Sequence, residues 1–124
     1  MNKISFKEAM EKGKLIEQNG YHQPQNAHYS SRCPCDLTTD KGAYRDMTFQ
    51  MPNGTLVHFY HQSPIAIEQN GKIRLDNCGY ETSTTKERIN RYSPFRVYQK
   101  DFVWYIDING EKKEFKNGMV VEKQ

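Results

Sequence analysis

The sequence predicts an α+β domain: a largely antiparallel sheet of short strands with an N-terminal helix and a second short helix inserted near residues 84–92. Asn-Gly pairs at 53–54, 70–71, 109–110 and 117–118 fall between short β-like runs, and Asn-Gly tolerates the positive φ values of tight hairpin turns. Capping patterns mark both helices. A chain of 124 residues has the length of one domain, so we expect a single domain over residues 1–124.

The first helix is predicted to begin at Ser5. Ser5 and Glu8 match a capping box, in which the two side chains satisfy free backbone amides at the helix start. Phe6, Ala9 and Met10 follow at helical spacing, which predicts one apolar stripe facing the sheet. Gly13 is expected to end this helix.

The strands are predicted from short apolar and alternating runs that begin at Met47. The runs cover residues 47–51, 56–62, 65–68, 72–75, 95–100, 102–108 and 119–122. In the run 102–108, successive side chains point to opposite faces. We therefore assign Phe102, Trp104, Ile106 and Ile108 to the core and Val103, Tyr105 and Asp107 to the other face.

The second helix is expected from Ser83 to Tyr92, ended by Pro94. Thr84 and Glu87 have the spacing of another capping box. Helical spacing places Thr85, Ile89 and Tyr92 on a side that packs on the sheet. Arg88 with Arg91, and Lys86 with Asn90, are expected on outward-facing sides.

Residues 18–46 show neither helical nor strand periodicity and predict a long irregular loop. Within it, His22, His28, Cys33 and Cys35 supply the two imidazoles and two thiolates of a tetrahedral zinc site. The Cys-x-Cys spacing is tighter than that of common zinc knuckles, so zinc is an alternative to unrelated loop residues and free thiols. No other cofactor is expected.

Composition favours a cytoplasmic protein, in the host cytoplasm if the chain is viral. No run approaches the length of a membrane-spanning segment, and Met1 leads directly into a charged helix. The three cysteines are an odd number, which fits a reducing compartment. We expect no membrane partner.

The positive charge is concentrated in the middle of the chain. Residues 72–100 carry seven Lys and Arg against three Asp and Glu, whereas residues 1–71 carry seven of each. Basic residues interleaved with aromatic ones can follow a phosphate backbone and stack on bases; alternatively, such charge serves only solubility. The candidate anion or nucleic-acid site consists of Lys72, Arg74, Thr84, Thr85, Lys86, Arg88, Arg91, Arg96 and Tyr98.

Within this set, the start of the second helix is the candidate phosphate cradle. Free backbone amides, the hydroxyls of Ser83, Thr84 and Thr85, and Lys86 can converge on an anion there. In the alternative interpretation, Glu87 caps the helix and repels anions.

The run Tyr60-His61-Gln62-Ser63-Pro64-Ile65, followed by Asn77-Cys78-Gly79-Tyr80-Glu81-Thr82-Ser83-Thr84-Thr85-Lys86-Glu87-Arg88-Ile89-Asn90, resembles a family of small uncharacterised bacteriophage and prokaryotic proteins. The similarity continues to a Phe115-x-x-Gly118 ending and covers roughly residues 56–121. Cys78 departs from it, standing where Gly or Ser is expected. The resemblance implies a viral or mobile-element origin and no particular activity.

The leading hypothesis is a phage-type accessory protein for host takeover or counter-defence. It would bind nucleic acid or an acidic host-protein surface. The alternative is a virion or replicon assembly protein, and the oligomeric state stays open. A third hypothesis, a hydrolase with Cys78 as nucleophile and His58 or His61 as base, lacks a supporting constellation, so we expect no enzyme.

Overall fold

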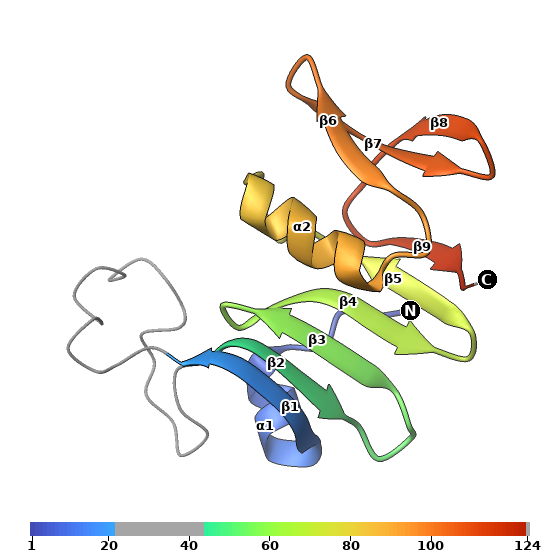
Figure 1. Cartoon of the computed structure of the whole chain (residues 1–124). Coiled ribbons are helices and arrows are strands. Elements are labelled where there is room, and N and C mark those ends of the chain that lie inside the picture. The colour runs from blue at the N-terminus through green and yellow to red at the C-terminus, as the bar shows by residue number, and fades with distance from the viewer. Residues whose placement is uncertain (22–43, 124) are drawn as a thin grey trace.

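The computed structural model describes residues 1–21 and 44–123, which form a mostly antiparallel α+β structure. The predicted fold class is therefore confirmed (Figure 1). The helices are α1 (Phe6–Lys12) and α2 (Ser83–Tyr92). The strands are β1 (Lys14–Tyr21), β2 (Tyr44–Gln50), β3 (Leu56–Tyr60), β4 (Ser63–Gln69), β5 (Lys72–Leu75), β6 (Val97–Lys100), β7 (Val103–Ile108), β8 (Glu111–Glu114) and β9 (Met119–Glu122).

The strands form two sheets. The large sheet has the order β1-β2-β3-β4-β5-β9, and the small sheet has the order β6-β7-β8. Neighbouring strands are antiparallel in both. The chain leaves the large sheet after β5, passes through α2 and the small sheet, and returns as β9 beside β5 (Figure 1).

Each face of the large sheet has its own core. Helix α1 contributes Ala9 and the partly buried Phe6 to one face, where Phe6, Phe49 and Phe59 meet edge to face. Ser5 caps this helix by accepting a hydrogen bond from the Glu8 amide at 3.1 Å, and Gly13 ends it, as predicted. The other face packs against α2 and the inner side of the small sheet, so the two sheets share one core.

Tight turns connect the strands much as the Asn-Gly pairs predict. Asn70-Gly71 and Asn109-Gly110 have positive φ at both positions and join β4 to β5 and β7 to β8. Two other turns also have positive φ at two successive positions but contain no glycine there: His61-Gln62 between β3 and β4, and Asp101-Phe102 between β6 and β7. Such values are uncommon for residues like Gln62 and Phe102. Strand β3 consequently ends at Tyr60, and the prediction that it extends to Gln62 is wrong.

Several sequence-based assignments need correction. Residues 18–21 belong to β1 and residues 44–46 to β2, so both ends of the predicted loop 18–46 are paired strands. Strand β1 is an edge strand with exposed polar side chains at Glu17, Gln18 and Asn19, which is why it lacks an apolar alternation. His22, His28, Cys33 and Cys35, proposed for zinc, lie outside the described residues.

The packing of Arg88 is a second correction. Arg88 was expected to point outward, but only 7% of it is exposed, and its Nε donates a 2.8 Å hydrogen bond to Asp46 on β2. Its guanidinium also lies 5.0 Å from the Tyr60 ring. Residues 85, 88, 89 and 92 form one helical stripe that faces the sheet. Arg88 is therefore buried, although its side chain is charged.

A group of side chains around His58 lies beside this ion pair, between α2 and the large sheet. We call it the histidine cluster. His58 Nδ1 is 2.8 Å from Thr48 Oγ1, and Nε2 is 2.5 Å from Glu68 Oε2. Tyr92 of α2 stacks on the imidazole with ring centroids 3.8 Å apart. Lys123 reaches Glu68 from the end of β9. The cluster therefore joins α2 to β2, β3 and β4 through buried polar contacts.

The Arg88–Asp46 pair predicts a large loss of stability on truncation. Arg88→Ala leaves a buried carboxylate without its main cation, which should lower the free energy of unfolding by about 3 kcal/mol. The matched control Arg91→Ala removes an exposed i,i+4 pair with Glu87 and should cost about 0.5 kcal/mol or less. Urea unfolding measures both changes. Equal effects for the two variants would contradict the assigned role of Arg88.

The histidine cluster predicts acid sensitivity. Burial lowers the pKa of His58 below its ordinary value of 6.5, despite the nearby Glu68 carboxylate. The unfolded chain therefore binds a proton that the folded chain does not, and the free energy of unfolding should fall as the pH drops below about 6.5.

Glu68 adds a second, more acidic step. Burial alone would raise its pKa, but hydrogen bonds from Lys123 and His58 lower the pKa below 4.5, so this stabilisation is lost at pH values below about 4.5. Urea unfolding across pH should show that His58→Asn loses the step that begins as the pH falls below about 6.5. An unchanged step in the variant would refute the His58 assignment.

Candidate nucleic-acid interface

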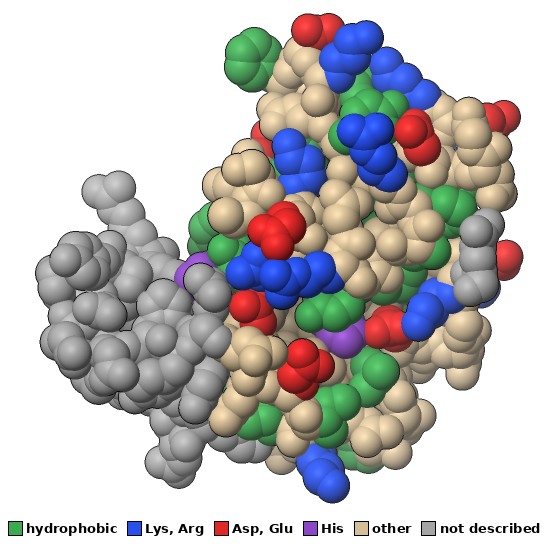
Figure 2. Space-filling model, viewed as in Figure 1, with side chains coloured by type: hydrophobic (Ala, Val, Ile, Leu, Met, Phe, Trp, Pro, Cys, Tyr) green, Lys and Arg blue, Asp and Glu red, His purple; other side chains and the backbone are tan. Residues whose placement is uncertain are grey.

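The outer face of the small sheet gathers aromatic and basic side chains. Alternation along β6 and β7 buries Val97, Trp104 and Ile106 against α2 and the large sheet. The opposite positions, Tyr98 and Tyr105, are directly paired across the two strands. Figure 2 shows Lys and Arg side chains clustered in the upper part of the view, over this sheet.

Four of these side chains form a continuous row. The guanidinium of Arg96 lies 5.0 Å from the Tyr98 ring centroid, and the ammonium of Lys112 lies 4.1 Å from the Tyr105 ring centroid. The two tyrosine rings are 5.8 Å apart and tilted by 32°. We call Arg96, Tyr98, Tyr105 and Lys112 the tyrosine row. The two rings lie in the middle of the row with one cation at each end, and the row crosses all three strands of the small sheet.

Hydrogen bonding fixes the orientation of Tyr98. Its hydroxyl donates a 2.9 Å hydrogen bond to Asp107 Oδ1 on β7. The pKa of Tyr98 is raised, first by desolvation and then by its hydrogen bond to Asp107 and the negative charge there. The phenol is therefore neutral at physiological pH, and the ring is held in place while it remains partly open to solvent.

The predicted site residues are distributed over several surfaces. Arg96 and Tyr98 lie in the tyrosine row. Lys86 lies on α2 at the opposite face of the small sheet, where its Nζ donates a hydrogen bond to Gln99 at 3.2 Å and lies 5.4 Å from the Trp104 ring. Arg91 is exposed and pairs with Glu87. Lys72 is exposed on β5 of the large sheet.

Arg74 is not free to meet a partner. It is partly buried, and its Nη1 lies 3.1 Å from Asp76 Oδ2. Its guanidinium occupies the space beside Gly118, where an ideal Cβ would lie 3.0 Å from Nη2. Gly118 has a φ of +84°, so both the backbone and the packing favour glycine.

The start of α2 differs from the predicted capping box. Thr82, not Thr84, is the N-cap, and its Oγ1 accepts a 3.2 Å hydrogen bond from the Thr85 amide. Thr85 is buried and bonds to Thr82, whereas Thr84 is exposed. Glu87 pairs with Arg88 and Arg91 instead of capping the helix. The threonine hydroxyls are thus mostly used within the helix terminus.

Sequence reasoning missed two members of the tyrosine row. Alternation places Tyr105 on the side of its strand away from the core, which is where it lies, but the sequence pattern does not mark it as a site residue. Lys112 belongs to β8, whose Glu-Lys-Lys-Glu sequence has no apolar alternation. The Asn109-Gly110 turn was the available signal, because it predicts a partner strand after β7.

Cys78 has surroundings that disfavour a thiolate. Burial and the charge of Asp76 raise its pKa from 9.0 to about 11. Its Sγ contacts the Pro64 carbonyl at 3.8 Å, while His58 contacts Thr48 and Glu68. Among the described residues, no group of three or more His, Cys, Asp or Glu is placed to hold a metal ion.

The shifted pKa predicts slow alkylation of Cys78. Two pKa units lower the thiolate fraction about a hundredfold, and the greater basicity of the thiolate recovers part of this, leaving a rate about tenfold below that of an ordinary thiol. Iodoacetamide labelling of a Cys33→Ser, Cys35→Ser variant, followed by mass spectrometry, measures Cys78 alone. Labelling as fast as that of a free cysteine peptide would contradict the assigned environment.

The fold and this surface define a small α+β protein with an exposed aromatic and basic sheet face. A family model described as Kyanoviridae Gp96 protein matches residues 42–122, well over half of the chain. The chain therefore belongs to the Kyanoviridae Gp96 protein family, a family of bacteriophage proteins. Of the viral or mobile-element origin that the resemblance implied, this match supports the viral one. The matched range runs from just before β2 to the end of β9 and includes the whole small sheet.

Searches of curated proteins and of solved structures gave no match. Neither helix in the described part of the chain is long and apolar enough to cross a membrane.

Proposed function

We propose that this phage protein binds single-stranded nucleic acid on the outer face of the small sheet. The tyrosine row carries the proposal. Tyr98 and Tyr105 offer neighbouring rings on which two bases can stack, and Arg96 and Lys112 stand at the two ends of the row, where a phosphate backbone would pass.

The geometry favours single strands over duplexes. Stacking needs bases whose flat faces are accessible, which a duplex does not offer, and the small sheet presents a face and no projecting helix for a groove. Asp107 and Glu114 also lie on this face, so the positive charge is moderate. We therefore expect modest affinity with strong salt dependence. In this proposal the protein is an accessory factor of host takeover or counter-defence and has no catalytic activity.

The stacking role predicts a specific pattern of losses. Binding of a fluorescein-labelled 15-nucleotide oligo(dT) or oligo(U) is measured by anisotropy. Tyr98→Ala with Tyr105→Ala should weaken binding at least about tenfold, because stacking contributes ~1–3 kcal/mol per base. Arg96→Gln with Lys112→Gln should reduce the slope of log K against log salt by about 1.4, or ~0.7 per lost phosphate contact.

The matched control is Lys72→Gln, which removes an exposed cation from the large sheet. It should leave affinity unchanged. No binding at low salt, or equal losses for Lys72→Gln and the row variants, would contradict the proposal. Binding to an acidic protein instead of oligonucleotide would show that the row recognises carboxylates.

A second candidate function, assembly of a virion or replicon, is favoured by one observation. Phe102 at the tip of the β6–β7 turn is 92% exposed, and Val120 on β9 is 42% exposed. Apolar side chains at such positions suit a protein interface. A stable higher oligomer in light scattering, together with no affinity for oligonucleotides, would favour this function.

A further inference from the structure

The side chain of Asp107 lies among the four side chains of the tyrosine row. It is partly buried, and alternation along β7 places it on the same outer face as Tyr105. Its backbone amide donates a 3.0 Å hydrogen bond to the Arg96 carbonyl, and on the other side it pairs in register with Lys112. A negative group at this place repels the phosphates of a bound strand, so its presence in the row needs another explanation.

Neither cation of the row neutralises this carboxylate. Among the described residues, Asp107 forms no ion pair. Arg96 lies over the Tyr98 ring instead. Lys112 lies over the Tyr105 ring. The Asp107 side chain accepts a hydrogen bond at Oδ1 from the Tyr98 hydroxyl. A carboxylate has about four acceptor positions, so those of Oδ2 are open to a ligand.

The Tyr98 hydroxyl fixes the place of this carboxylate relative to the ring. A phenol hydroxyl projects from the edge of its ring, so Asp107 lies beside the Tyr98 ring and leaves its face open. A base that stacks on Tyr98 and extends past the hydroxyl therefore brings one edge to Asp107. Glu114, opposite Tyr105, is the other carboxylate on this face. It is exposed, and its side chain is held by no contact with another described residue.

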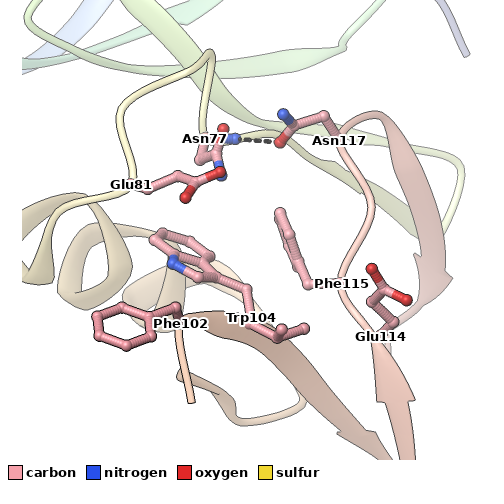
Figure 3. Close-up of a pocket in the computed structure, with 8 residues that line it drawn as sticks. Asn77, Glu81, Phe102, Trp104, Glu114, Phe115 and Asn117 are labelled. Atoms are coloured by element: carbon pink, nitrogen blue, oxygen red, sulfur yellow. Dashed lines mark hydrogen bonds between the residues drawn. The ribbon is translucent and has the colours of Figure 1, made fainter. Parts of the chain in front are cut away.

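The Trp104 and Phe115 rings on the inner face of the same sheet are closed to a base. Figure 3 shows the two rings beside each other, with centroids 5.5 Å apart. They are 5% and 7% exposed and belong to the core shared with α2 and the large sheet. Base recognition by the small sheet therefore falls to the outer face, where Asp107 lies.

We propose that Asp107 makes the tyrosine row prefer guanine. This inference rests on the proposed binding of single strands and names the base that the same site selects. A carboxylate only accepts hydrogen bonds. The Watson–Crick edge of guanine carries two adjacent donors, N1–H and the N2 amine, which can meet both oxygens of one carboxylate.

The other bases match a carboxylate less well. Adenine and cytosine offer one amine donor next to a ring nitrogen that is itself an acceptor, and the carboxylate repels that acceptor. Thymine and uracil place one N–H between two carbonyl oxygens, which repel it as well. Guanine stacked on Tyr98 is thus the base whose edge fits Asp107 best.

The test compares strands whose bases stack alike but differ in their donors. Fluorescein-labelled 15-nucleotide strands repeat dT-dT-X, where X carries guanine, hypoxanthine or adenine; hypoxanthine is guanine without the N2 amine. Lithium buffer keeps the guanine strand from forming quadruplexes. In anisotropy titrations the guanine strand should bind at least about fivefold more tightly than the adenine strand, with the hypoxanthine strand between them. Oligo(dT) is measured alongside as the reference for the row itself.

Two variants and a control assign the preference to Asp107. Asp107→Asn keeps an acceptor for the Tyr98 hydroxyl but replaces the second oxygen with an amide donor, so the three purine strands should bind within about twofold of one another. Tyr98→Phe removes the hydroxyl that positions the carboxylate and should reduce the guanine preference. The control Glu114→Gln removes an equal charge from the same face and should keep the preference.

Equal affinity of the native chain for the guanine and adenine strands, with oligo(dT) still bound, would overturn this inference and leave the proposed function standing. A guanine preference that survives in Asp107→Asn would also overturn it, because the carboxylate would then act through its charge alone. So would an equal loss of preference in Glu114→Gln. If none of the strands binds, the proposed function fails, and this inference fails with it.

Discussion

The buried ion pair between Arg88 and Asp46 is the contact on which the arrangement of the two sheets depends. It joins α2 to β2 across 42 residues of sequence, and Tyr92 stacked on His58 strengthens the same contact. Helix α2 in turn holds the small sheet, because the Asn90 side chain makes two 2.8 Å hydrogen bonds to the backbone of Val97 at the start of β6. The orientation of the tyrosine row therefore follows from how α2 is docked.

Local signals in the sequence predicted much of the fold. Capping and glycine signals placed α1, and Asn-Gly pairs placed turns, because both depend on neighbouring residues alone. The edge strands β1 and β8 escaped prediction, since exposed edge positions need no apolar alternation. Phe102 was assigned to the core by alternation and is instead 92% exposed, because the β6–β7 turn takes it out of the strand. The division into two sheets depends on long-range pairing of β5 with β9, which no local pattern encodes.

The sequence predicted the candidate site only in part, again because local patterns do not encode long-range contacts. The enrichment of basic residues in 72–100 drew attention to the segment that contains Arg96 and Tyr98 of the tyrosine row. That enrichment could not separate exposed cations from paired ones. Arg88 pairs with Asp46, which is distant in the sequence, and Arg74 pairs with Asp76, which lies in the same segment.

Mapping of chemical shifts is the most direct measurement of the central claim, that the tyrosine row is the binding face. In ¹H–¹⁵N and aromatic ¹H–¹³C spectra with added oligo(dT), the account predicts that the largest changes fall on Tyr98, Tyr105 and the backbone of β6 to β8. The strands β1 and β9, at the two edges of the large sheet, should be unaffected. Changes concentrated on the large sheet, or no changes at low salt, would contradict the account.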